Sequence, residues 1–435
     1  MKIPSFIRGN LLLKMTSLNA GVIIVRLVIS AFVQRLLTEY VGPVGQYKIG
    51  QLRSLTTFLT SVASLGTFNG IVKYIAEYKN NGGQLQRLFS TVFVFAVFGT
   101  AITGILLFLF SRQLSEYLFS TPDFAYLIKL TAVIVPFIAI QRVFNGVING
   151  LSEYKKYAKI DLISYFISIT LTIVFLLQYN LDGALIAIAL TPAIQTGVML
   201  FFFYKVLREY IPFKNIEFKT PMAKSLFAFT LMSFVSSILL PIVEIDIRSM
   251  LDDRLSGRDA GIWTNMTFIS QNYMVFSSSL FTLYVIPKFA GIYDYQKFRT
   301  EVFSIYKTLL PLFAVGMVLI YLFRNLIIEL IYPGQIEMAV LFKWQLMGDF
   351  VRLASLVLAH QFLAKKLVVN FIFTEILSLI VFYTLAYLLT GKYGVEGVVI
   401  AHFIRCLITF AVIVYLVFRY FRKQGEKLEP NKIEE

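Results

Sequence analysis

The chain has 435 residues, of which 57% are hydrophobic and only 15% are charged. A water-soluble domain carries about 25% charged residues, so the composition excludes a soluble globular enzyme. The formal net charge of +15 would favour nucleic acid as the partner of a soluble protein. Here, however, the basic residues lie between hydrophobic segments of about 20 residues, which recur along the whole chain and predict an all-α polytopic membrane protein with no nucleic-acid partner.

Short polar breaks separate about twelve predicted membrane-spanning helices. The longest break runs from Arg208 to Lys224, at the midpoint of the chain. We therefore predict an N-terminal six-helix bundle at 1–208, a cytoplasmic linker at 209–223, a C-terminal six-helix bundle at 224–421 and a polar cytoplasmic tail at 422–435. The predicted spans lie near 14–38, 45–75, 87–111, 125–150, 157–179, 183–207, 224–251, 260–288, 304–327, 337–363, 367–390 and 396–420.

Lysines and arginines are concentrated on alternate segments between the predicted spans. They include Lys155-Lys156, Lys365-Lys366 and most basic residues of the linker and the tail. Positively charged residues favour the cytoplasmic side of a span, so we expect both termini to be cytoplasmic.

The two halves of the sequence share an internal repeat. Arg142 precedes Lys155-Lys156 by the same distance as Arg352 precedes Lys365-Lys366. The segment LDGALIA, which begins at Leu181, likewise matches VEGVVIA, which begins at Val395. These matches predict two six-helix halves related by a pseudo-two-fold axis along the membrane normal, with a central cavity between them.

Arginines inside predicted spans are the candidate functional residues. A charged side chain at the centre of a lipid-facing helix costs at least about 2.5–3.5 kcal/mol, so each needs a partner or a wet cavity. Arg26 shares a helical face with Asn19, and Arg53 lies close to Gln51. We favour a cavity for both arginines, with a structural ion pair as the alternative for Arg26.

Other embedded charges have simpler alternatives. Glu244 and Arg248 are spaced to form an ion pair on one helix. Asp349 and Arg352 share a face, as a self-paired group or a proton-sensitive latch. The remaining candidates are Arg35 and Lys48 near the membrane interface, Arg142 in the fourth span, and Arg405, which lies one turn from His402.

Embedded bases outnumber embedded acids, which favours an anionic passenger because guanidinium binds phosphate oxygens bidentately. The sequence has no glycine-rich phosphate loop, so we expect no cofactor and no ATP site. An ion gradient or the membrane potential is the expected energy source.

Several segments resemble one family of membrane proteins. GTFNGIVKYIAEYKNNGGQLQR, FTLMSFVSSILLPIVEIDIRSML, GIWTNMTFISQNYMVFSSSLFTLYVIPKF and FKWQLMGDFVRLAS are similar to segments of Wzx-type lipid-linked oligosaccharide flippases. The resemblance covers essentially the whole chain. It is strongest to the branch that handles enterobacterial common antigen and related O-antigen units.

The resemblance implies the multidrug/oligosaccharidyl-lipid/polysaccharide exporter fold, a V of two six-helix bundles in the bacterial inner membrane. It implies a flippase that moves an undecaprenyl-pyrophosphate-linked glycan unit, such as an O-antigen unit, to the periplasmic leaflet by alternating access. A polymerase and a chain-length regulator of the glycan pathway are the implied protein partners. The family's basic residues match at Arg26, Arg35, Arg53, Arg248 and Arg352, and its acid matches at Asp349, whereas Arg142, Arg405, Glu244 and Asp246 depart from its pattern.

The expected binding residues for the pyrophosphate and glycan are Arg26, Arg53, Arg248, Arg352, Asn19 and Gln51. Asp349 and Glu244 are candidates for ion coupling or gating, and Arg142, Arg405 and Lys48 are weaker cavity candidates. The alternatives are a multidrug cation antiporter of the same fold, a membrane O-antigen polymerase or ligase, and a non-transporting partner in glycan assembly.

Overall fold

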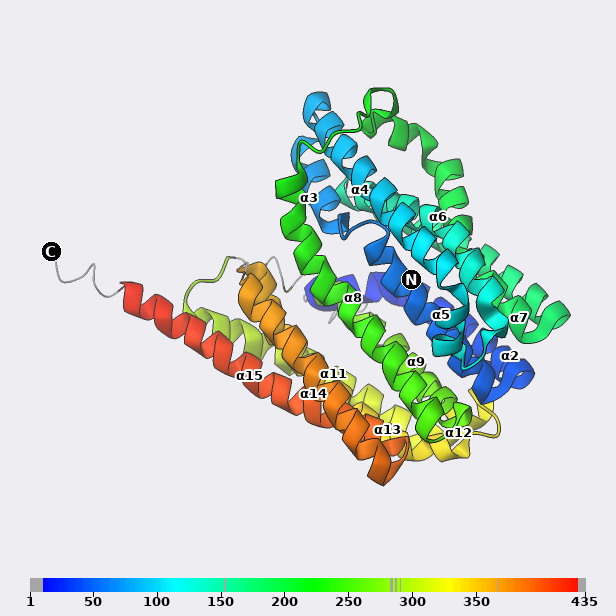
Figure 1. The fold of residues 1–435 in the computed structure, drawn as a ribbon. Coiled ribbons are helices and arrows are strands. Elements are labelled where there is room, and N and C mark those ends of the chain that lie inside the picture. Colours follow the sequence, from blue (N-terminus) through cyan, green and yellow to red (C-terminus); the bar gives the residue numbers. More distant parts are fainter. Residues whose placement is uncertain are drawn as a thin grey trace. The chain divides into compact units, whose positions relative to one another are not determined.

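The computed structural model describes residues 11–151, 154–281, 285, 288–289, 291–365 and 367–428. Within these residues the chain is helical and contains no β-strand (Figure 1), which confirms the predicted all-α class. The long helices are α2 (Leu11–Val62), α4 (Gly82–Leu109), α6 (Ala125–Gly150), α7 (Tyr154–Tyr210), α8 (Ala223–Arg254), α9 (Gly257–Leu280), α11 (Tyr295–Leu322), α13 (Leu341–Ala364), α14 (Val368–Tyr393) and α15 (Glu396–Leu428). The shorter elements are α3 (Phe68–Tyr78), α5 (Ser111–Phe119), α12 (Arg324–Ile331) and the 3-10 turns η1 (Pro122–Phe124), η2 (Phe213–Asn215) and η4 (Ile336–Val340).

Most of the described residues in the predicted spans lie in helices. Seven of the helices searched in the described chain are long and apolar enough to cross a membrane, which confirms a polytopic membrane protein. Two long helices each contain an interruption between neighbouring predicted spans: α2 is non-helical at Gly42 and α7 at Asn180.

The predicted continuous helix over 45–75 is wrong in one respect, because the chain turns at residues 63–67 before α3 begins. Leu65 has φ 46° and Gly66 has φ 66°. The Gly66 N–H donates to the Ser61 carbonyl at 2.8 Å and the Leu65 N–H donates to the Val62 carbonyl at 3.0 Å. This is the Schellman arrangement that ends helices, and a leucine in its left-handed position gives no signal in the sequence.

The internal repeat extends to the backbone conformation. Asn180 (φ 51°, ψ −130°) and Gly394 (φ 59°, ψ −143°) occupy equivalent positions before the matched LDG and VEG segments. Ser120 and Gly334, at the same offset, also have positive φ, and each lies between a short helix and a 3-10 turn. Both halves therefore contain the same local chain reversals.

The chain divides into two compact units. One contains the described residues up to Glu39 and from Leu251 onward, and the other contains Tyr40–Met250. The first part of α2 therefore groups with the helices of the second half, and most of α8 groups with those of the first half. The six-plus-six division with a linker at 209–223 remains a prediction.

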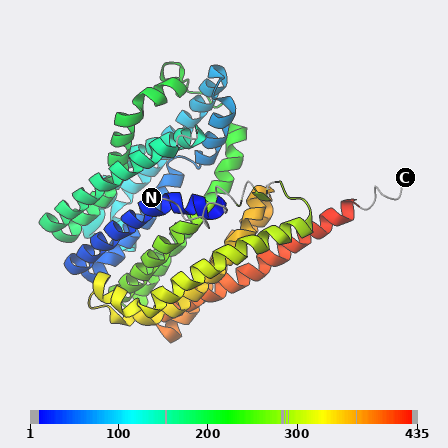
Figure 2. The ribbon, with the colours of Figure 1, turned by 180° about the vertical axis from the view of Figure 1, so that it is seen from behind.

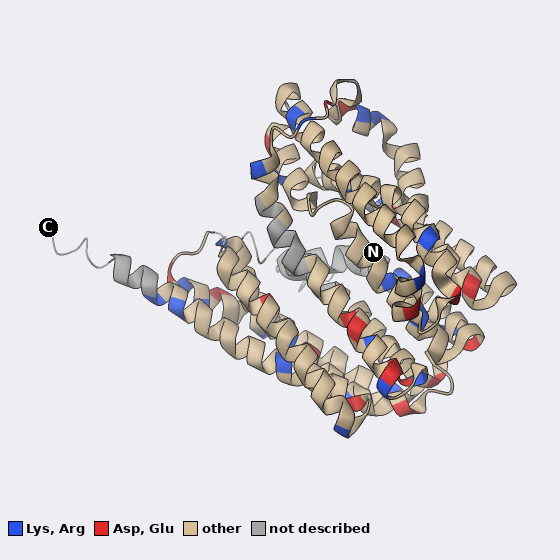
Figure 3. Cartoon of the chain, viewed as in Figure 1, with Lys and Arg blue, Asp and Glu red and all other residues tan. Residues whose placement is uncertain are grey.

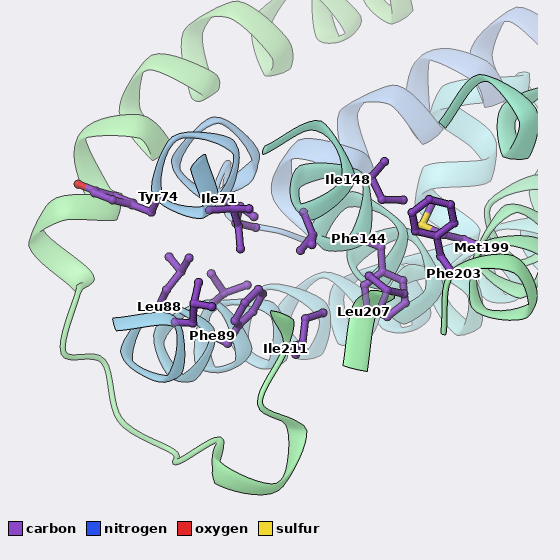
Figure 4. Packing of buried hydrophobic residues seen from close by; sticks show 14 of the residues in the cluster. Ile71, Tyr74, Leu88, Phe89, Phe144, Ile148, Met199, Phe203, Leu207 and Ile211 are labelled. Carbon is purple, nitrogen blue, oxygen red and sulfur yellow. The ribbon is translucent and has the colours of Figure 1, made fainter. Parts of the chain in front are cut away.

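In the Tyr40–Met250 unit, α3 packs closely on α6 (Figure 4). A Cβ atom at Gly146 would lie 2.9 Å from Ile71 Cγ2, and one at Gly150 would lie 2.7 Å from Ile75 Cβ. The two glycines are one turn apart and let the helices approach, as small residues do between membrane helices. Further buried side chains from α4 and α7 complete this core, among them Leu88, Phe89, Met199, Phe203 and Leu207.

In the other unit, α13, α14 and α15 lie side by side in both ribbon views, together with α11 (Figure 2). Phe298 of α11, Leu353 of α13 and Phe421 of α15 belong to its apolar core. Charged residues are sparse along these helices (Figure 3), so the few that are buried among them define the candidate site.

Candidate functional site

Asp349 of α13 is fully buried and is the centre of a polar cluster within one compact unit. Its Oδ2 atom accepts hydrogen bonds from Ser270 Oγ at 2.6 Å, from Gln345 Nε2 at 3.0 Å and from the Tyr273 hydroxyl. Its Oδ1 atom lies 3.0 Å from His402 Nε2 of α15. Helices α9, α13 and α15 therefore meet at one carboxylate, whose burial is offset by these hydrogen bonds.

The contacts of His402 indicate which ring nitrogen carries the proton. Nη2 of Arg405 lies 3.1 Å from His402 Nδ1. A guanidinium N–H is only a donor, so Nδ1 accepts and Nε2 carries the hydrogen that is donated to Asp349. The arrangement therefore fits a neutral imidazole between a carboxylate and a guanidinium.

Gly348 makes room for this pair. A Cβ atom at position 348 would lie 2.5 Å from His402 Cδ2 and 3.2 Å from the Phe403 Cα atom. Any larger residue would push α15 away from α13, because one of these contacts is to the backbone. The glycine next to Asp349 is thus part of the site's construction.

Helix α13 has two different faces. Gln345, Asp349 and Arg352 lie on the face that carries the polar cluster, whereas Met347 and Phe350 lie on the opposite face by the helical period. Arg352 is half-buried, Arg405 is buried, and the neighbouring helix α14 carries Glu375. The two guanidinium groups are therefore equalled in number by the carboxyl groups of Asp349 and Glu375, which leaves no basic surplus among these four residues.

A second polar cluster joins α2 and α8 in the Tyr40–Met250 unit. Arg248 is buried, donates to Ser54 Oγ at 2.9 Å and lies 3.6 Å from Glu244 Oε2. Ser54 in turn donates to Glu244 at 3.1 Å. The ion pair that the spacing of Glu244 and Arg248 suggested is therefore present, and it is bridged by a hydroxyl from the neighbouring helix.

Gln51 extends this cluster by one turn. Its Nε2 atom donates to the Ile245 carbonyl at 3.2 Å and to Ser249 Oγ at 3.0 Å. On α8, Asp246 accepts a hydrogen bond from the Tyr117 hydroxyl at 2.6 Å. The side chains of Gln51 and Arg248 therefore hold α2 against α8 in this conformation.

Arg26 and Arg53 differ from Arg248 in exposure. Both are half-buried, whereas Arg248 is 3% exposed and Arg405 is 8% exposed. Arg26 belongs to one compact unit and Arg53 to the other. The side chain of Asn19 lies outside the described residues.

The weaker candidates contact aromatic rings. Lys48 Nζ lies 4.5 Å from the centroid of the Phe124 ring, and the Arg142 guanidinium lies 3.9 Å from that of Phe68. Arg35 pairs with Glu39 and donates to the carbonyls of Glu329 and Leu330 at 2.7 and 2.9 Å. These carbonyls lie in the last turn of α12, so Arg35 satisfies a helix C-terminus.

The sequence did not predict the contact between Asp349 and His402. It placed Asp349 in one span and His402 with Arg405 in another, and no local pattern joins positions so far apart. The available signal was Gly348, because a glycine beside an embedded acid indicates a close helix approach. Ser270 and Tyr273 carried no signal of their own, since a hydroxyl on an apolar helix is common.

Comparison with known proteins gives the context of these clusters. The family described as polysaccharide biosynthesis protein matches residues 12–293. A protein named lipid III flippase from Escherichia coli strain K12 is 26% identical over 412 residues, which cover 92% of this chain and 97% of that protein. A lipid III flippase from Shigella flexneri matches to the same extent.

Two solved structures share the fold. An inward-facing multidrug resistance MATE family transporter of the MOP superfamily has a TM-score of 0.77 and 14% identity, over 91% of this chain and 95% of that one. The lipid II flippase MurJ in an inward closed conformation has a TM-score of 0.74 and 17% identity, over 94% of this chain and 89% of that one. These similarities confirm the all-α polytopic membrane fold that the sequence predicts.

Proposed function

Because this chain belongs to the polysaccharide biosynthesis protein family, we propose that it is a flippase for a lipid-linked glycan and not an enzyme. Relatives named lipid III flippase, which align with nearly the whole chain, support this proposal. Its substrate is an undecaprenyl-pyrophosphate-linked oligosaccharide unit of O-antigen or a related surface glycan. The unit moves from the cytoplasmic to the periplasmic leaflet of the inner membrane, and both termini of the chain are cytoplasmic.

The observation that carries the proposal is the partial exposure of arginines in apolar helices. Arg26, Arg53 and Arg352 are half-buried, whereas Arg248 is buried and bonded to Ser54 and Glu244. A guanidinium binds phosphate oxygens bidentately and keeps its charge at all physiological pH values. We assign these three residues to the pyrophosphate, and Asn19 to the adjoining sugar.

Arg248 and Gln51, in this proposal, bind the substrate only in another conformation of the protein. Both are buried and bonded between α2 and α8, so they contact the substrate only in a conformation that loosens these helices. Alternating access supplies such a conformation. Glu244 and Asp349 are the groups through which an ion gradient acts, since each is the acid at the centre of one polar cluster.

A multidrug cation antiporter of the same fold is the competing function. A cation passenger requires an unmatched carboxylate in its binding site. Asp349 and Glu244 are instead engaged by His402 and Arg248 respectively. In this conformation neither carboxylate is therefore available to a cationic passenger. In the cell, a polymerase and a chain-length regulator would take over the flipped units.

The test is surface delivery of the glycan in cells that lack the chromosomal copy of the protein. Arg26→Ala combined with Arg53→Ala should abolish delivery at wild-type expression, and Arg26→Lys with Arg53→Lys should restore part of it. Loss of delivery should be accompanied by accumulation of the undecaprenyl-linked unit. Normal delivery by the double alanine variant would overturn the assignment of these arginines.

A further inference from the structure

An apolar groove runs between α11 and α13, on the face of α13 opposite the Asp349 cluster. Its volume is about 540 Å³, which lies within the range of pockets that hold small organic ligands. It is lined by Met317, Val318, Tyr321, Leu346, Met347 and Phe350, and Phe403 of α15 lies against it. Methionine and aromatic side chains adapt to irregular apolar chains.

Two cations border one end of this groove. Lys343 lines it and is exposed. Arg324 lies over the ring of Tyr321 at 4.3 Å and donates to the Tyr321 carbonyl at 2.8 Å. No carboxylate pairs with either residue within the part of the chain that the structure describes. The groove is therefore apolar along its length and positively charged at its end.

The dimensions suit one half of a bilayer. From Lys343 to Val351, α13 rises by about 12 Å, and the hydrocarbon core is about 30 Å thick. The charged end coincides with the ends of α11 and α13 that the distribution of lysines and arginines predicts to be periplasmic. A lipid in this groove would thus have its headgroup at the outer surface.

The internal repeat supplies a built-in comparison. A smaller hollow of about 370 Å³ lies between α4 and α6 and is lined by Gly104, Ile105, Phe108, Leu109, Ala132 and Val133. Lys129 lies 5.5 Å from the Phe108 ring, as Lys343 borders the equivalent groove. Glycine and alanine replace Met317 and Leu346 there, so the hollow has fewer large side chains to enclose a chain.

We infer that the α11–α13 groove binds the isoprenoid tail of the lipid-linked substrate, with its pyrophosphate at Lys343 and Arg324. The inference rests on the proposed flippase function and adds a second, outer binding site for the same substrate. Two unmatched cations suit a pyrophosphate better than the single charge of a phospholipid. A groove formed by only two principal helices also suits one chain better than two acyl chains. The site holds the delivered lipid by its tail after the glycan has crossed.

The test is photo-crosslinking of full-length protein in nanodiscs with a diazirine-labelled polyprenyl diphosphate. Crosslinked peptides identified by mass spectrometry should come from α11 and α13. Met347→Trp, which fills the groove, and Lys343→Gln with Arg324→Gln should each reduce the yield about tenfold, an effect of the size of lost charge-assisted or apolar contacts. Val133→Trp and Lys129→Gln in the α4–α6 hollow are the matched controls and should leave the yield unchanged.

Competition identifies the occupant. Unlabelled polyprenyl diphosphate should displace the probe, and phosphatidylglycerol at the same concentration should not. Equal competition by phosphatidylglycerol, or equal labelling of both hollows, would overturn the inference. Size-exclusion profiles of the variants must match the wild type, and the Lys343→Gln with Arg324→Gln variant decides the test if Met347→Trp does not fold.

Glycan transport measured in the same preparation separates the two proposals. If the wild type moves the glycan but the probe labels other helices, the groove inference fails and the flippase proposal stands. If the wild type moves no glycan, the flippase proposal fails whatever the probe labels.

Discussion

The Nε2 atom of His402 lies 3.0 Å from the Oδ1 atom of Asp349, although the two residues are 53 positions apart. This contact joins α13 to α15 inside an apolar unit. Ser270, Tyr273 and Gln345 donate further hydrogen bonds to the same carboxylate. A buried group with so many partners is expensive to disturb.

Asp349→Ala should therefore destabilise the protein strongly. It leaves the N–H and O–H donors around the carboxylate without an acceptor, and removing one partner of a buried charged group costs about 3–5 kcal/mol. The measurement is the thermal unfolding temperature in detergent. Lys307→Ala, an exposed change on α11, is the control and should have no effect. An Asp349→Ala variant as stable as this control would contradict the described cluster.

Gly348→Ala should separate α13 from α15. The added Cβ atom would lie 2.5 Å from His402 Cδ2, and overpacking of this kind costs about 1–3 kcal/mol. Gly391→Ala on α14 is a matched control, because no atom lies within 4 Å of a Cβ at that position. The control should stabilise its helix by about 0.5–1 kcal/mol, so thermal unfolding should shift in opposite directions. An unfolding temperature for Gly348→Ala that is unchanged or raised would show that His402 does not approach Gly348.

The helical fold was predictable from the sequence because hydropathy reports directly on membrane helices. The predicted breaks at 39–44 and 180–182 also coincide with the interruptions at Gly42 and Asn180. The turn at Leu65 was not predictable, since it is stabilised by the hydrogen bonds from Leu65 to Val62 and from Gly66 to Ser61, and not by the residue type of the leucine. Local conformation of this kind is decided by the fold.

The site was only partly predictable. The spacing of Glu244 and Arg248 correctly indicated an ion pair, because both residues lie on one helix. The partners of Asp349 lie on α9 and α15, and the carbonyls capped by Arg35 lie on α12. Such contacts depend on tertiary packing, which no local pattern in the sequence reveals. Tertiary packing also decides that Arg53 is half-buried whereas Arg248 is buried.

The Glu244–Arg248 pair should behave as a coupled unit. Arg248→Met alone leaves Glu244 without its cation and should cost about 3–5 kcal/mol, whereas Glu244→Gln with Arg248→Met removes both charges and should recover most of that loss. A double-mutant cycle on unfolding temperature measures the coupling. Additive effects of the two single changes would show that the 3.6 Å contact is not energetically significant.

Asn180→Gly should stabilise the protein. Asn180 has φ 51° and ψ −130°, a conformation that costs a non-glycine residue about 1–3 kcal/mol. The repeat-equivalent position already holds Gly394, so Gly394→Ala should lose a similar amount. Thermal unfolding of the two variants should therefore change with opposite sign. A lower unfolding temperature for Asn180→Gly would mean that the asparagine side chain stabilises this reversal.

The central claim is that this protein moves a lipid-linked glycan between leaflets by means of the half-buried arginines Arg26 and Arg53. The most direct measurement uses sealed vesicles that contain purified protein and fluorescently labelled undecaprenyl-pyrophosphate-linked sugar in both leaflets. An impermeant quencher reports the fraction of label exposed outside. The account predicts that wild-type protein brings the inner-leaflet label to the quencher within minutes, and that Arg26→Ala with Arg53→Ala leaves it protected as in protein-free vesicles. Equal exchange by wild type and this variant, or none by wild type, would contradict it.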